Sequence, residues 1–143
     1  MSFDLKIVRG DIALEPDGSI STVTGNSKLK QDIIKIMLTG LGENKFHPSY
    51  GSETGALKVG TALTAELIEL DLSSSAEDAV RKLMSLQRAQ AKKQFLSPSE
   101  VILDIVAVNV ERDQLDPRMY NIFISVLTEK LDNITENVTV RIS

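Results

Sequence analysis

The last third of the chain limits its fold most, because it contains three successive strand-like segments. Residues 101–110 are nearly continuous apolar, β-branched sequence, which is typical of a strand buried on much of both faces. Residues 119–127 form a partner strand in which alternate side chains share one face, namely Tyr120, Ile122, Ile124 and Val126. Residues 137–142 alternate apolar and polar side chains throughout. These segments predict a small, mainly antiparallel sheet.

The N-terminal segment predicts a β-hairpin. Residues 3–8 begin as an alternating strand, and Arg9-Gly10 ends this run. Two further strand-like runs, 11–14 and 19–23, flank Pro16-Asp17-Gly18. Proline presets φ for a turn and glycine accepts a positive φ, so this tripeptide is expected to close the hairpin.

Helices are predicted between the two β regions. Asn26 or Ser27 can cap a first helix, with the apolar stripe Leu29, Ile33, Ile36, Met37 and Leu41. A short helix is expected over 62–72, before a capping box at Ser75 opens a longer helix that ends near Phe95. The inward stripe of that longer helix is Val80, Leu83, Met84, Gln87, Ala91 and Phe95. The expected fold is one α+β domain over residues 1–143, with two to three helices on one face of the sheet.

Composition excludes several classes of protein. The formal net charge is −4 and the pI is near 5.0, which disfavours binding to nucleic acid. No apolar run is long enough to span a bilayer and no signal peptide is evident, so we expect no membrane partner and folding in a cytoplasm. There are no cysteines, so disulfides and thiolate sites are excluded. A basic stripe, Arg81, Ser85, Arg88 and Lys92, is either a solvated helix face or a docking site for an acidic protein.

Residues suited to catalysis are few. His47 is the single histidine and has no metal-ligand or triad partner near it in sequence. Glu43 with Glu53, or with Asp104, could flank a sugar as glycosidase carboxylates do, but the chain has no Trp to form a sugar platform. The sequence therefore predicts a protein that is not an enzyme, with no catalytic residues, no metal ligands and no cofactor.

One stretch of the chain has the form of a known motif. The hairpin Gly10-Asp11-Ile12-Ala13-Leu14 to Ser19-Ile20 and the helix from Ser27 lead into Gly42-Glu43, then Phe46, then Pro48-Ser49-Tyr50-Gly51. In order, spacing and residue type this resembles the phage baseplate family called gene-product-twenty-five-like or W-like, whose members are also described as sheath initiators. The later layout of long helix, proline and β-branched strands is similar as well. Where that family carries Glu-Pro-Arg, this chain has Ser97-Pro98-Ser99, so only Pro98 is carried over.

The resemblance implies a structural subunit of a contractile tail, which links the baseplate wedge to the tail sheath and starts the first sheath ring. The implied partners are the tail sheath protein and wedge subunits, with tail tube or hub proteins as further candidates. The implied setting is a ring of six copies in the virion baseplate, after assembly in the host cytoplasm. A tailocin or type-VI-like injection system, and a lysozyme-like peptidoglycan hydrolase of the tail, are the alternatives.

Two groups of residues are expected to make these contacts. The wedge contact is assigned to Glu43, Pro48, Tyr50, Gly51 and Pro98. Tyr50 and Gly51 are also expected to pack the loop, with Glu43 as the charged contact. The sheath contact is assigned to the alternating strand Val138, Thr139, Val140, Arg141 and Ile142, either as a template for strand addition or as a strand of the chain's own sheet.

Overall fold

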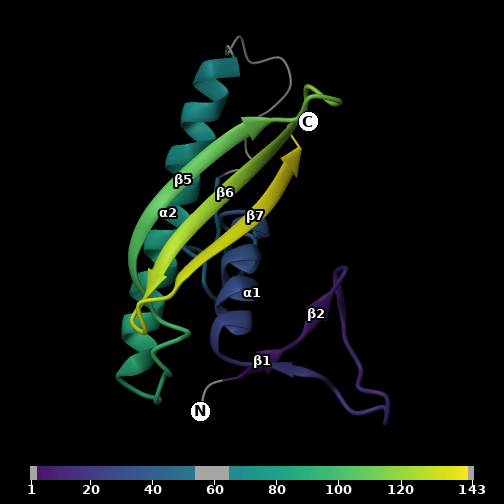
Figure 1. Cartoon of the computed structure of the whole chain (residues 1–143), viewed down its shortest axis with the longest axis vertical. Coiled ribbons are helices and arrows are strands. Elements are labelled where there is room, and N and C mark those ends of the chain that lie inside the picture. Colours follow the sequence, from purple (N-terminus) through teal and green to yellow (C-terminus); the bar gives the residue numbers. More distant parts are fainter. Residues whose placement is uncertain (1–2, 54–64, 142–143) are drawn as a thin grey trace.

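Three antiparallel strands from the last third of the chain form the main sheet of the computed structural model, which describes residues 3–53 and 65–141 (Figure 1). They are β5 (Ile102–Arg112), β6 (Met119–Thr128) and β7 (Asn133–Arg141), in the order β5-β6-β7. On β6, buried residues alternate with partly exposed ones along the whole strand. The predicted inward face of β6 is confirmed, because Tyr120, Ile122, Ile124 and Val126 are all buried.

β5 differs from its prediction. It is an edge strand in which Leu103 and Val106 are 48% and 54% exposed, rather than a strand buried on both faces. The pairing with β6 shifts between Ile102 and Asp104 and again between Ile105 and Ala107. Each shift leaves one extra residue unpaired, as in a β-bulge. The continuous apolar run therefore reflects two bulges and not two buried faces.

The first helix, α1 (Gly25–Leu38), confirms the predicted stripe except at its end. Its buried apolar residues are Leu29, Ile33, Ile36 and Met37. The N-cap is Thr24 rather than Asn26 or Ser27, and the backbone becomes extended at Thr39. Leu41 therefore lies beyond the helix, and its side chain is 42% exposed.

The second helix, α2 (Ala65–Ala91), is one continuous helix rather than two. The serines at 73–75 do not interrupt it, because Leu72 and Ala76 on either side are both buried against the core. Packing of that face outweighs the modest helix propensity of serine. The helix ends at Ala91, so Phe95 lies outside it and is 72% exposed; Ala91 is exposed too. The first residues of the predicted short helix, 62–64, lie outside the described part of the chain.

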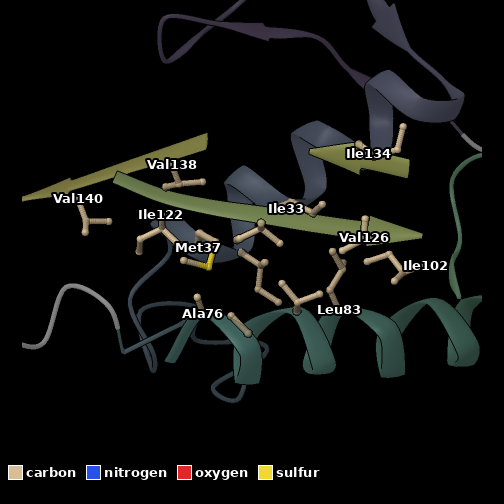
Figure 2. Packing of buried hydrophobic residues seen from close by; sticks show 14 of the residues in the cluster. Ile33, Met37, Ala76, Leu83, Ile102, Ile122, Val126, Ile134, Val138 and Val140 are labelled. Carbon is tan, nitrogen blue, oxygen red and sulfur yellow. The ribbon is translucent and has the colours of Figure 1, made fainter. Parts of the chain in front are cut away.

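Both helices pack on the same face of the sheet, which gives an α+β fold as predicted. Figure 2 shows Ile33 and Met37 of α1 and Ala76 and Leu83 of α2 directed toward Ile122 and the other inward side chains of the sheet. No described helix has the length and apolar character needed to cross a membrane.

Residues 3–23, here called the N-terminal arm, form a separate twisted ribbon (Figure 1). Strand β1 (Asp4–Leu5) pairs with β4 (Thr22–Val23), and β2 (Ile7–Val8) pairs with β3 (Asp11–Ile12). The predicted turn is confirmed: Glu15 N donates to Ser19 O at 2.8 Å, and Leu14 and Ile20 form a bridge. Most apolar side chains of the arm are exposed, as in Leu14 at 65%.

Candidate interaction site at the end of the C-terminal strand

The loop after α1 returns on itself and is bonded to the end of that helix. Ser52 holds both ends together: its N–H donates to Thr39 O at 2.9 Å, and its hydroxyl donates to Met37 O at 2.7 Å. Gly51 has a φ of +124°, and a Cβ there would lie 2.6 Å from Thr39 O. Only glycine fits this backbone, so the predicted role of Gly51 in bending the loop agrees with the structure.

The carboxylate of Glu43 closes the start of this loop. Its Oε2 accepts a hydrogen bond of 2.9 Å from Gly40 N, while Glu43 N donates to Gly40 O at 3.1 Å. This reciprocal pair orients the side chain, which stays exposed to solvent. Glu43 is therefore a positioned surface acid.

The remaining motif residues shape the loop. Asn44 Oδ1 accepts hydrogen bonds from Phe46 N and His47 N, and exposed Pro48 offers its carbonyl to Gly42 N at 3.1 Å. Tyr50 is half-buried against the core, as predicted for a packing residue, and this burial raises the pKa of its hydroxyl.

A groove of about 600 Å³ lies between this loop, the end of α1 and the end of β7. It is lined by Met37, Leu38, Thr39, Gly40, Leu41, Glu43, Ser52, Glu53, Thr139, Val140 and Arg141. Its walls are mainly apolar, and two of the lining residues, Leu38 and Leu41, are 60% and 42% exposed. The fold therefore brings Glu43 next to the strand residues that were predicted separately.

β7 lies at an edge of the main sheet, paired with β6 on one side only among the described residues. Val138 and Val140 are buried and Thr139 and Arg141 are exposed, so the predicted alternation is observed. The strand completes the chain's own sheet, which is one of the two roles weighed for it, and the template role stays a prediction. Ile142 lies outside the described residues.

Pro98 lies away from this groove. It is in the connection between α2 and β5, where its carbonyl accepts a hydrogen bond of 3.2 Å from Lys130 N. That connection is at the opposite end of the sheet from the last residues of β7 (Figure 1). The five residues assigned to wedge contact therefore do not form one surface.

Sequence reasoning did not identify Ser52 as part of the site, and it considered Glu53 only as a possible member of a catalytic pair. Ser52 and Glu53 directly follow the Pro-x-Tyr-Gly ending. The parallel bridge between Gly40 and Ser52 places them beside the end of α1. No local periodicity marks such a bridge. Among the described residues, no group of three or more His, Asp or Glu side chains could hold a metal ion.

The fold is similar to that of a crystal structure described as a "putative tail lysozyme" from Geobacter sulfurreducens. The TM-score is 0.60, the sequence identity is 11%, and the match covers 81% of this chain and 89% of that one. At this identity the likeness establishes a shared fold. No family model and no curated protein matches the sequence.

This comparison contradicts one expectation from the sequence. The lone His47, the absence of Trp and the lack of a catalytic motif predicted a protein that is not an enzyme, whereas the similar structure bears an enzyme's name. The prediction was wrong because it tested only for known residue patterns. One fold can carry both catalytic and structural functions, and a site assembled from distant segments leaves no such pattern.

Proposed function

We propose that this chain is a baseplate subunit of a contractile phage-type tail, in which the free edge of β7 receives a strand from the tail sheath protein. The observation that carries this proposal is the position of β7, an alternating strand at the edge of the sheet. The similar structure named for a tail protein supports the setting, and the resemblance of the loop motif to sheath initiators supports the role.

The register of β7 suits strand addition. Thr128 N donates to Asp132 O at 3.0 Å, which starts the β6–β7 ladder with a hydrogen-bonded pair. Such pairs alternate with non-bonded ones along an antiparallel ladder. From Leu127 paired with Asn133 onward, every second residue of β7, including Asn137 and Thr139, therefore directs its N–H and C=O to the free edge.

The groove beside β7 would add side-chain specificity to this backbone pairing. Exposed Leu38 and Leu41 offer apolar contact, and Glu43 and Glu53 place negative charge on the rim. An added strand with an apolar residue near a basic one would fit both features, because side-chain pockets select among strands that all make the same backbone bonds.

The wedge contact is proposed on the loop from Gly40 to Ser52. Its backbone is held by bonds to α1, so binding would cost little ordering entropy. Phe46 is 91% exposed at its tip and is the largest apolar group that the loop presents. Pro98, at the far end of the sheet, would then touch a second wedge protein or none.

The test replaces Asn137 with proline. Asn137→Pro removes an N–H that an added strand needs and that in the isolated chain donates to Glu136 Oε1 at 3.2 Å, whereas Asn137→Ala keeps this N–H and serves as the matched control. We expect sheath to assemble on baseplates with the alanine variant and to fail with the proline variant, provided that circular dichroism shows both folded. Thr139→Pro repeats the test two residues further along. Normal sheath on both folded proline variants would refute strand addition.

A second candidate, peptidoglycan cleavage, is favoured by one observation beyond the name of the similar structure. Glu43 and Glu53, weighed as a carboxylate pair from the sequence, line the same groove, whereas Asp104 lies on β5 away from it. Purified protein would then degrade peptidoglycan, and Glu53→Gln would abolish the activity. Glu43→Gln keeps an acceptor for Gly40 N. Loss of activity in this variant would therefore indicate a catalytic role of the carboxylate and not a disturbed loop.

A further inference from the structure

A second groove, of about 580 Å³, lies between the N-terminal arm and α1. Its apolar surface comes from Ile7 and Val23 of the arm and from Ile34 and Leu38 of the helix. Four basic residues, Lys6, Arg9, Lys30 and Lys35, line it, and no described carboxylate does. This groove shares Leu38 and Thr39 with the groove beside β7, but its basic residues and its arm wall are not part of the proposed sheath contact.

The two walls of this groove are held together by Gln31 and Lys35. The amide of Gln31 accepts a hydrogen bond of 3.0 Å from Ile7 N and donates to Leu5 O at 2.8 Å. Lys35 Nζ lies 2.6 Å from Asp4 Oδ2, so its charge is already paired. The groove is thus preformed, and no ion pair is found for Lys6, Arg9 or Lys30 within the described residues.

The same chain carries a surface of matching chemistry on α2. Residues 65–78 contain five acids, Glu66, Glu69, Asp71, Glu77 and Asp78, and no basic residue. Glu77 is paired with Arg81 at 2.6 Å, and no ion pair is found for the other four within the described residues. Leu70 is 64% exposed among them. At 1.5 Å per residue this acidic half of α2 is about 20 Å long, which suits a groove formed along a helix. The basic residues of α2 all lie in its second half, from Arg81 onward.

These two surfaces lie at opposite ends of the molecule. Figure 1 shows the start of α2 near one end of the long axis, and the N-terminal arm toward the other. One chain therefore cannot fill its own groove with its own helix. Contact between copies would be head-to-tail, which builds a ring or an open row rather than a closed dimer.

We propose that the groove between the N-terminal arm and α1 binds the acidic half of α2 from a second copy of this chain. The bases of the groove face the acids of the helix, and Leu70 enters the apolar floor next to Ile34. Such a contact would also cover apolar side chains of the arm that the isolated chain leaves in water. It is independent of the free edge of β7, so either proposal can fail without the other.

The test measures the mass of the full-length chain in solution by sedimentation at increasing concentration. We expect association in about 0.05 M salt that is at least tenfold weaker in about 0.5 M salt, because exposed charges are screened. The groove variant Lys6→Ala/Lys30→Ala and the helix variant Glu66→Gln/Asp71→Asn should each be monomeric. Lys92→Ala/Lys93→Ala removes the same charge from the turn that follows α2, outside the groove, and should associate as the parent does.

Mixing the two monomeric variants gives the decisive result. Each supplies one intact surface, so a head-to-tail contact predicts a 1:1 dimer that grows no further. Circular dichroism of each variant establishes that it is folded before it is mixed. A parent chain that stays monomeric at low salt would overturn the proposal. So would association that only the groove variant weakens, which would indicate a groove-to-groove contact.

Discussion

The side-chain oxygen of Gln87 on α2 accepts a hydrogen bond of 2.9 Å from the backbone N–H of Ile102 at the start of β5. The amide nitrogen of Gln87 donates to Glu100 O at 2.8 Å, so one buried side chain satisfies both backbone groups. This clamp fixes where the chain leaves the connection after α2 and enters the sheet.

Replacing Gln87 with leucine should destabilise the fold by about 2–4 kcal/mol, because a buried donor and a buried acceptor lose their partners together. Gln87→Glu keeps the acceptor for Ile102 N, but it buries a carboxylate whose second oxygen faces Glu100 O, so at neutral pH it should cost at least as much as the leucine variant. Urea unfolding gives both free energies. Equal stability of the leucine variant and the parent would contradict the clamp.

Glu100 should be replaceable with a gain in stability. Its side chain is 1% exposed, and neither carboxylate oxygen has a hydrogen-bond partner in the structure. A buried, unpaired acid costs free energy, so Glu100→Met should raise the free energy of unfolding by about 1–3 kcal/mol. Thermal and urea unfolding measure the change. Loss of stability would mean that the carboxylate has a partner in solution.

Gly51→Ala should cost about 3 kcal/mol or more, because its Cβ would meet the carbonyl of Thr39 as well as a φ of +124°. Gly42→Ala is the matched control: its φ is +87°, but a Cβ there meets nothing within 4 Å. We expect it to cost only about 1 kcal/mol. Similar losses in the two variants would show that backbone strain rather than the close approach to Thr39 dominates.

The ion pair between Lys35 and Asp4 should make attachment of the N-terminal arm depend on pH. Burial alone would raise the pKa of Asp4, but the hydrogen bond and charge of Lys35 outweigh it and hold this pKa below the usual 3.8. A lowered folded-state pKa stabilises the fold at pH values above 3.8, and that contribution is lost as pH falls through the lowered value.

The measurement is the difference in unfolding free energy between the parent and Asp4→Asn, followed from about pH 6 to about pH 2. We expect a difference of about 1 kcal/mol at the upper end, since both side chains are partly exposed, and none at the lower end. Lys30→Met, which removes an unpaired lysine of the same helix, should show no such trend. A difference that is constant with pH would exclude the ion pair as its source.

Much of the fold was predictable because hydrophobic periodicity is local. The inward face of β6, the stripe of α1 as far as Met37 and the turn at Pro16-Asp17-Gly18 were predicted from residues only a few positions apart, and all three are confirmed. The two bulges of β5 were not, because a continuous apolar run is compatible with either bulges or burial on both faces. The continuity of α2 across 73–75 depends on core contacts of Leu72 and Ala76, which the serines themselves do not indicate.

The candidate site, like the fold, has some features that the sequence predicts and others that only the tertiary structure shows. The sequence by itself determined the alternation of β7, the loop motif and the glycine at 51, since each depends on the chemistry of neighbouring residues. Only the tertiary structure decided that β7 is an edge strand, that Glu43 and Glu53 share a groove with Arg141, and that Pro98 lies at the far end of the sheet. The physical reason is that strand order and groove walls follow from pairing and packing between segments far apart along the chain, which residue patterns within one segment do not specify.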